Sequence, residues 1–554
     1  MTRTRPIPAA ARLAEALATA PGRAFALAAA LALALAPAAA RAQSGRAWRP
    51  GERVLVTRFA DIGAVATDLR AVYAAAVLGL ERYDVTARRW QPPVTALDGY
   101  PAGDRPVALA VDPAGNALWL ATATGLWSYD LSFGRWTRAP VATPGPISSL
   151  VATPDALWIF AAPQWLRLRP GSFFADPVPS AQVPPAVRGQ VGSPLERAAR
   201  ADPFLASTLG SLGVSERLRH FPVTSAAPGE RPGSWWLGTW GGNLLRFDGH
   251  TGESERLEFG LVSQGATALA AEPDGRALWF GGDARGPWSG VTRAAADLSE
   301  WRSWDSRQDD APDRAVAAIL PAADAVWFGA ADGLYRLDRH DERLSRLDER
   351  DGLPSSDVEA LAPADSGIWV GTRGGLALLG RDGRMRLRLL PGTPVHALIR
   401  TPGGLLASTD AGLLLLTPDT VPSDSAAAAA ANQYTGVHVT LLLRERTLAA
   451  VPAGGLTWAI TPAGLTRYES GTWAPARDAT LAAIGRPLAL AGDARGLWVA
   501  GAGGIARWDA AARAWRAYTV GPDLPVGPVS AVLPLGDAVW AATPAGAVRL
   551  PLGF

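Results

Sequence analysis

Apolar and polar positions alternate along most of the chain in short runs separated by glycine, proline and aspartate. The stretch Asp324–Asp338 shows the unit clearly. An apolar run, Val326–Ala330, carries a tryptophan; Asp332-Gly333 is typical of a tight turn; and Leu334–Leu337 resumes the strand pattern. This pattern predicts two antiparallel strands joined by a hairpin, and helical periodicity is nearly absent from such units.

The hairpin recurs down the chain. Its anchor positions are Tyr73, Trp119, Trp158, Trp236, Trp279, Trp327, Trp369, Leu406, Trp458, Trp498 and Trp540. Apart from the 78 residues between Trp158 and Trp236, neighbouring anchors lie 37 to 52 residues apart. Blades of about 40–50 residues with four strands each are typical of β-propellers. The sequence therefore predicts an all-β fold, a β-propeller of about eleven four-stranded blades.

The repeated tryptophan has a structural interpretation. Blades pack face to face, so a large rigid ring at one repeated position fills each wedge between blades. The alternative is a tryptophan floor that stacks a planar cofactor or sugars. Recurrence of the position in almost every blade favours core packing, because a ligand site would use only a few copies.

Two segments interrupt the repeats, and eleven blades exceed the usual four to eight of one ring. We therefore expect two rings. The predicted division is an outer ring of about six blades (43–170 and 433–554), an insertion (171–217), an inner ring of about five blades (218–418) and an alanine-rich linker (419–432). The alternative is two sequential halves that divide near residue 305, with a twelfth repeat hidden near residue 195.

The N-terminal residues predict export. Residues 1–42 combine a basic leader, an Ala/Leu-rich run at 24–36 and a small-x-small cleavage site at Ala40-Arg41-Ala42. An uncleaved anchor is the alternative. We predict a periplasmic or secreted protein with no transmembrane span after cleavage. The strand at Arg53–Thr57 has no hairpin ahead of it, so we expect it to complete the last blade.

Composition excludes several kinds of chemistry. The formal net charge is +2, which gives no support for nucleic acid as a partner. The chain contains no cysteine, which excludes thiol catalysis, thiolate metal sites and disulfides. All 53 basic residues are arginine, so mechanisms that need a lysine nucleophile are excluded as well.

One known repeat resembles these units. Asp351–Val358 followed by Asp365–Leu376 is similar to the two-component regulator propeller repeat, a DGLP-type turn and strand followed by a W-x-G-T-x-x-G-L hairpin. Trp236–Thr239 and Asp332–Tyr335 match it too. The resemblance implies a sensor-type periplasmic propeller or a secreted scaffold. We find no kinase or membrane domain, so we expect no signalling within this chain.

Few residues are candidates for chemistry. Of the five histidines, none has a metal-ligand spacing, but His396 and Glu359 lie on strands that could reach a ring axis. Asp248–Glu253 is similar to the turn of quinone-cofactor propellers, although an ordinary Asp-Gly turn explains it. Acidic loops at Asp309-Asp310 and Asp348–Asp351 lack the ligand spacing of a Ca²⁺ loop. We assign no catalytic, cofactor or metal residue.

The function predicted is binding. We expect a non-enzymatic extracytoplasmic propeller that holds an envelope protein or a glycan at a ring face or between the rings. The alternative is a propeller-type lyase or hydrolase with a central polar pocket, which a histidine and two or more carboxylates at a ring axis would favour. A third hypothesis is a detached sensor that signals through a membrane partner.

Overall fold

The computed structural model describes residues 48–112, 116–172, 174–215, 218–418, 436–493 and 495–552. Within them the fold is all-β, with eleven antiparallel sheets of four or five strands, as predicted for propeller blades. The predicted signal sequence, residues 1–42, lies outside the described residues. In the described part of the chain, no helix is long and apolar enough to cross a membrane.

The predicted hairpin forms as β24 (Ala325–Ala330) and β25 (Gly333–Asp338). Ala330 faces Gly333, so the turn residues are Ala331 and Asp332, one position earlier than the sequence suggests. Glycine is required at 333, because a Cβ there would lie 2.9 Å from the carbonyl oxygen of Leu347 on the next strand.

Four sheets form a small ring, which we define as residues 62–257. Their innermost strands are neighbours in the order β15, β2, β7, β11. The sheets are β2 (Ile62–Thr67), β3 (Ala71–Ala76), β4 (Gly79–Asp84), β5 (Arg89–Trp90) and β6 (Val94–Thr95); β7 (Pro106–Asp112), β8 (Ala117–Thr122), β9 (Gly125–Asp130) and β10 (Arg135–Ala139); β11 (Ile147–Thr153), β12 (Ala156–Ala161), β13 (Gln164–Leu168) and β14 (Ala175–Val178); and β15 (Val223–Pro228), β16 (Ser234–Thr239), β17 (Leu244–Asp248) and β18 (Ser254–Leu257).

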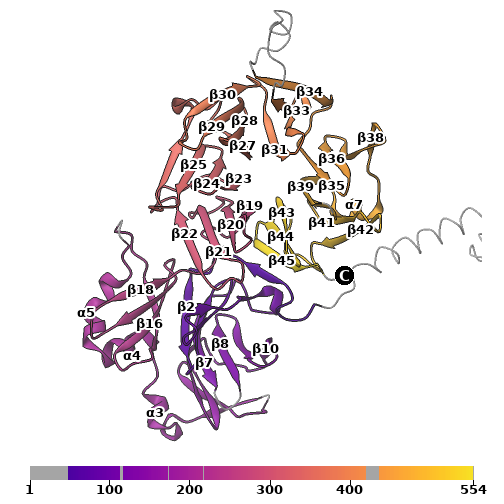
Figure 1. Ribbon diagram of the computed structural model, residues 1–554. Helices are drawn as coiled ribbons and strands as arrows, with labels where there is room; N and C mark the ends of the chain where they lie inside the picture. Colours follow the sequence, from indigo (N-terminus) through magenta and orange to yellow (C-terminus); the bar gives the residue numbers. More distant parts are fainter. Residues whose placement is uncertain are drawn as a thin grey trace, which may run out of the picture. The chain divides into compact units, whose positions relative to one another are not determined.

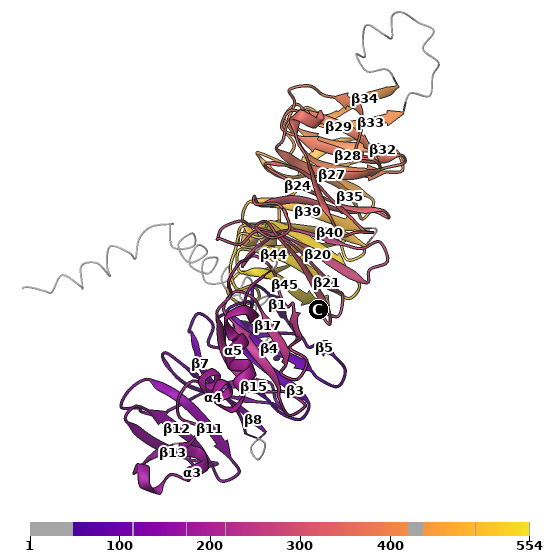
Figure 2. The ribbon, with the colours of Figure 1, turned by 90° about the vertical axis from the view of Figure 1, so that its left-hand side faces the viewer.

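Helices occupy the remaining sector of the small ring, between β14 and β15 (Figure 2). They are η2 (Ser180–Gln182), α3 (Pro185–Arg188), α4 (Pro194–Ala201) and α5 (Pro203–Leu212). Val187 of α3 packs in one cluster with Trp158 and Trp165, while Leu205 of α5 packs against Phe247. The helices therefore bury the sheet faces that a further blade would cover.

Seven sheets form a large ring, which we define as residues 54–56 and 266–551. Its innermost strands are neighbours in the closed order β19, β23, β27, β31, β35, β39, β43. The sheets are β19 (Ala266–Ala271), β20 (Ala277–Gly282), β21 (Gly290–Ala295) and β22 (Trp301–Asp305); β23 (Val316–Pro321), β24, β25 and β26 (Leu344–Leu347); β27 (Val358–Ala364), β28 (Gly367–Thr372), β29 (Gly375–Gly380) and β30 (Met385–Leu389); β31 (Val395–Thr401), β32 (Gly404–Thr409), β33 (Gly412–Pro418) and β34 (Val437–Leu443); β35 (Ala449–Ala453), β36 (Leu456–Thr461), β37 (Gly464–Glu469) and β38 (Thr472–Pro475); β39 (Pro487–Asp493), β40 (Gly496–Gly501), β41 (Gly504–Asp509) and β42 (Ala514–Thr519); and β43 (Ala531–Leu535), β44 (Ala538–Thr543), β45 (Gly546–Pro551) and β1 (Val54–Val56).

Three further short helices occur among the described residues. The small ring also carries η1 (Ala96–Asp98), and the large ring carries η3 (Glu349–Asp351) and α7 (Ala479–Ile484). The predicted role of the N-terminal strand is confirmed, because β1 pairs with β45 and completes the last sheet, with Leu55 opposite Val548. A strand from the start of the chain thus closes the large ring.

The observed grouping of the sheets differs from the predicted outer ring (43–170 and 433–554) and inner ring (218–418). The small ring is the inserted one, and it takes in the sheets on both sides of the predicted insertion (171–217). The predicted linker (419–432) lies outside the described residues, but β33 and β34 on its two sides pair within one sheet. A break in the repeat pattern can therefore fall inside a blade or inside a ring.

The repeated anchors are core residues, as predicted. Each lies on the second strand of its sheet, and nine of the eleven are less than 9% exposed; Trp119 and Trp369 are half-buried. An arginine on the third strand often lies over the tryptophan side chain. Arg336, for example, faces Trp327, with its guanidinium carbon 5.8 Å from the centroid of the indole. The guanidinium covers one face of the indole, and burial of the whole side chain, 1% exposed at Trp327, leaves the indole closed to a ligand.

Candidate ligand groove between the rings

Two chain segments, residues 57–61 and 258–265, connect the rings and run antiparallel to each other. The Leu261 amide donates to the Thr57 carbonyl (2.9 Å), and the Thr57 hydroxyl donates to the Gln264 carbonyl (2.9 Å). The Gly241 amide of the small ring donates to the Ala60 carbonyl (2.7 Å). The crossing is therefore a hydrogen-bonded ribbon that continues into the small ring.

Aromatic side chains pack on this ribbon from both rings. Phe259, which is buried, has its ring centroid 4.5 Å from Trp90 of the small ring and 5.3 Å from Trp301 of the large ring. Phe59 on the opposite segment lies 5.3 Å from Phe259. Aromatic side chains that pack tightly across a junction resist bending of that junction. We therefore infer that this cluster fixes the small ring against the large ring.

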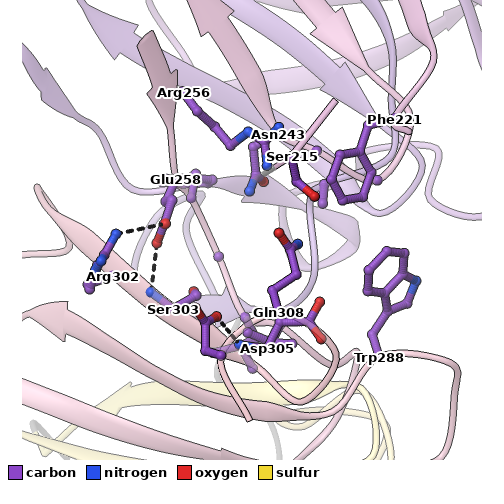
Figure 3. A pocket seen from close by; sticks show the side chains of 18 of the residues that line it. Ser215, Phe221, Asn243, Arg256, Glu258, Trp288, Arg302, Ser303, Asp305 and Gln308 are labelled. Atoms are coloured by element: carbon purple, nitrogen blue, oxygen red, sulfur yellow. Dashed lines mark hydrogen bonds and ion pairs between the residues drawn. The ribbon is translucent and has the colours of Figure 1, made fainter. Parts of the chain in front are cut away.

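Beside the ribbon lies a groove of about 950 Å³ that is lined by both rings (Figure 3). Four arginines and five carboxylates line it, so its charge is nearly balanced: Arg58, Arg256, Arg302, Arg343, Glu258, Asp305, Asp309, Asp310 and Glu342. Its volume matches that of sites for a small ligand or a short extended segment. The lining favours a polar partner that offers both donors and acceptors.

Arg58, Trp288, Phe221 and Arg256 line one wall of the groove, and Arg219 stacks on both of the aromatic rings. The Arg219 guanidinium lies 3.6 Å from the centroid of Trp288 and 5.3 Å from that of Phe221. Arg58 lies 4.6 Å from Trp288, and Arg256 lies 5.0 Å from Phe221. Since Trp288 precedes β21 and Phe221 precedes β15, the stack joins the large ring to the small one and holds this wall in place.

The opposite wall is a carboxylate held by the large ring. Glu258 accepts from the backbone amide of Ser303 (2.6 Å) and pairs with Arg302 (3.4 Å), as Figure 3 shows. Burial raises the pKa of Glu258, while Arg302 acts in the opposite direction. Asp305 pairs with Arg219 (3.3 Å), which ties this wall to the stack.

Some polar groups of the groove have no partner of their own. Asn243 Oδ1 and Arg58 Nη2 are buried and accept or donate no hydrogen bond within the described residues. The Gln308 side chain points into the groove (Figure 3). Buried polar atoms without a protein partner destabilise the fold unless a water, an ion or a ligand bonds to them, so these two atoms are available to a polar ligand in the groove.

The structure brings the candidates His396 and Glu359 together. The imidazole Nδ1 lies 2.6 Å from Glu359, and Nε2 lies 2.8 Å from Asp410. Arg373 and Arg446 pair with these carboxylates (2.8 and 2.6 Å), and the cluster spans the two adjacent sheets that begin with β27 and β31. Hydrogen bonds to Glu359 and Asp410 raise the pKa of His396, with burial acting against them.

This cluster brings together a histidine and two carboxylates, the residue types that would favour an enzyme. Both nitrogens of His396 are already bonded to carboxylates, however, and each carboxylate is paired with an arginine. A general base needs a nitrogen within reach of the substrate proton. The geometry therefore fits an ion-pair clamp between blades better than a catalytic centre.

The other candidates are ordinary turns and caps. Asp248 accepts from the amides of His250 and Thr251, which defines a turn, and Asp348 with Asp351 forms a capping box around η3. Asp309 accepts from the Asp305 amide (2.8 Å) and lines the groove. Among the described residues, no group of three or more His, Cys, Asp or Glu side chains could hold a metal.

Comparison with known proteins adds two distant likenesses. The extracellular domain of the "putative one component system BT4673 from B. thetaiotaomicron" is 13% identical with a TM-score of 0.40, over 89% of this chain and 69% of that one. PorZ, described as a "bacterial surface component of the type-IX secretion system" of Porphyromonas gingivalis, is 11% identical with a TM-score of 0.46. The match covers 90% of this chain and 87% of PorZ. No family model and no curated protein matches the chain.

Of the groove residues, sequence reasoning considered Asp309 and Asp310, as an acidic loop, and missed the aromatic and arginine residues. Trp288 lies outside the repeat anchors, and Phe221, Arg219 and Glu258 lie in connections whose pattern carries no motif. They meet only because the small ring is inserted between β1 and β19. The signal that could have found them was the lone strand at Arg53–Thr57, which implies that the chain leaves a ring and returns to it.

Proposed function

We propose that the protein is a non-enzymatic extracytoplasmic binding protein that holds a partner, a protein segment or a glycan, in the groove between its rings. The observation that carries this proposal is the groove itself, about 950 Å³ and lined with charges of both signs from both rings. Rigid blades on each side keep its walls in place, as binding loops require.

The chemistry of the lining supports a polar partner. Guanidinium, carboxylate and amide side chains offer planar donors and acceptors, which suit hydroxyl groups or a peptide backbone. Arginine and tryptophan are also the residues that contribute most at protein interfaces. The predicted signal sequence and the resemblance to regulator-type propeller repeats support a location outside the cytoplasm and a scaffold or sensor role.

Affinity capture with and without an obstructed groove tests this proposal. Gln308→Trp places a large ring in the groove, while Gln182→Trp places the same ring on η2, where Gln182 is exposed. Wild type and Gln182→Trp are expected to retain one stoichiometric envelope protein, or one glycan on an array. Gln308→Trp is expected to lose it. Equal retention by all three proteins would refute the groove as the binding site.

A further inference from the structure

One glutamate of the small ring is buried without a partner. Glu81 on β4 is 0% exposed, and neither oxygen of its carboxyl makes a hydrogen bond within the described residues. Its position is defined by strand pairing, because Glu81 lies opposite Ala74, the residue that follows the anchor. At the equivalent position the ten other sheets have leucine, alanine, threonine, valine, tryptophan or tyrosine. The blade fold therefore does not require an acidic residue here, although burying one is costly.

The carboxyl lies in the aromatic packing that joins the rings. Side chains alternate along a strand, so Glu81 shares its face of β4 with Gly79 and Tyr83. A Cβ at Gly79 would lie 2.6 Å from the ring of Phe59, which belongs to the ribbon between the rings. The Tyr83 ring lies 5.0 Å from Trp90, which packs on the aromatic side chains of the ribbon. Glu81 is therefore flanked on both sides along its strand by contacts of the junction.

Other titratable groups lie on the elements packed against this face. Besides Tyr83 on the same strand, they are Arg58, Asp61 and Glu258 of the ribbon, Arg246 of β17, Glu255 of β18 and Tyr100 after η1. The two arginines and Glu258 have ion pairs of their own, Glu255 is exposed, and the Tyr100 hydroxyl donates to a backbone carbonyl (2.6 Å). Burial raises the pKa of the Glu81 carboxyl well above its ordinary value, so the closed junction holds this group in its neutral form.

We propose that Glu81 is a pH-sensitive lock on the junction between the rings. A negative charge among these aromatic side chains would have neither water nor a partner, so the carboxyl ionises only when the packing opens and admits water. Opening releases one proton for each molecule. Rising pH therefore favours the open junction, and falling pH favours the closed one. The lock acts on the junction itself and does not depend on what the groove binds.

Hydrogen exchange of the full chain at several pH values tests the lock. The reporters are the Leu261 and Gly241 amides, which donate to the ribbon carbonyls of Thr57 and Ala60. In the open junction the Glu81 carboxyl has an ordinary pKa of about 4.3, so the closed junction keeps its full stability below that pH. Above it, the protection factor of both amides is expected to fall by up to about tenfold per pH unit, until the buried carboxyl itself ionises. A protection factor that does not change with pH would overturn the proposal.

Two variants remove the titration and one control retains it. Glu81→Gln keeps the shape of the side chain but cannot ionise, so its protection factors are expected to stay constant with pH. Glu81→Leu is expected to show the same flat profile with higher protection, because it removes a buried polar group without a partner. Glu253→Gln makes the same chemical change at an exposed glutamate of the adjacent sheet and is expected to keep the wild-type slope. The wild-type slope in both Glu81 variants would overturn the proposal.

The amides of β28 in the large ring separate a local lock from a change in overall stability. At each pH they are expected to have the same protection factors in wild type and in the Glu81 variants, because β28 lies outside the junction. A fall in β28 protection that matches the fall at Leu261 and Gly241 would mean that ionisation of Glu81 unfolds the whole chain. That result would overturn a lock at the junction.

Discussion

The two rings close in different ways. The large ring has seven sheets and closes through backbone hydrogen bonds, because β1 from the start of the chain pairs with β45 at its end. The small ring has four sheets and closes through side chains, because helices α3 to α5 fill the sector between β14 and β15. Blades pack on one another through their faces, so a sector can be filled by any element that buries the same apolar surface.

The strongest test of this comparison disrupts the strand closure. Val56 is fully buried on β1, so Val56→Asp places a charge in the core and weakens the pairing with β45. We expect the free energy of unfolding of the large ring to fall by about 4 kcal/mol or more. Urea titration followed by tryptophan fluorescence measures it. Leu69→Asp, at a fully exposed position, is the control, and equal midpoints for the two variants would contradict strand closure.

The helical closure is expected to be somewhat weaker. Leu205 of α5 is fully buried against Phe247, so Leu205→Ala leaves a cavity between helix and sheet. We expect a loss of about 3 kcal/mol in the stability of the small ring. Phe204→Ala next to it, at a residue 45% exposed, is expected to cost much less. Limited proteolysis within residues 179–222 reports the same difference locally, and equal cleavage rates would argue against a closing role.

A smaller effect is expected at the junction of helix and sheet. Asp202 caps α5 by accepting from the amides of Phe204 and Leu205, and its other oxygen accepts from the Trp235 indole (2.8 Å). Asp202→Ala is expected to cost about 1–2 kcal/mol in thermal or urea unfolding. Asp202→Asn is expected to restore the cap but not the bond to Trp235, because its amide oxygen can accept from the Phe204 and Leu205 amides while its NH2 group cannot accept from the indole. An asparagine variant as stable as the wild type would show that the bond to Trp235 contributes nothing, and one no more stable than Asp202→Ala would argue against the helix cap.

The smallest effect concerns the ion-pair clamp of the large ring. Hydrogen bonds to Glu359 and Asp410 raise the pKa of His396, so protonated His396 stabilises the fold. This contribution is complete below the unfolded pKa of histidine, about 6.5, and is lost as pH rises through the folded pKa. We expect His396→Gln to lower stability by about 1 kcal/mol at pH 6 and by less at pH 9. The same difference at both pH values would exclude a charged clamp.

The sequence predicted the blades well because each blade repeats one local pattern. The hairpin, the buried tryptophan and the completing strand at Arg53–Thr57 all follow from alternation, turn residues and spacing within about 50 residues. The grouping into rings could not be predicted in the same way. The contacts that group the sheets, such as β19 with β43, join positions that are far apart in the sequence.

The candidate site was less predictable than the fold. His396 and Glu359 were noted only as residues on strands that could reach a ring axis; their contact was not predicted, and their partner Asp410 lies in a hairpin turn that resembles every other turn. The groove is lined by Trp288, Phe221 and Glu258, which come from connections without a repeat pattern. A pattern of polar and apolar positions predicts which side chains are buried, but it does not predict which connections meet.

The central claim is that the groove between the rings holds the partner, and site-specific photo-crosslinking in the native envelope tests it most directly. A benzophenone side chain at position 308 would lie in the groove, and one at position 182 would lie on the exposed helical sector. The account predicts one discrete adduct, a protein or a glycan, from position 308 and none from position 182. The same adduct from both positions, or an adduct from position 182 alone, would contradict it.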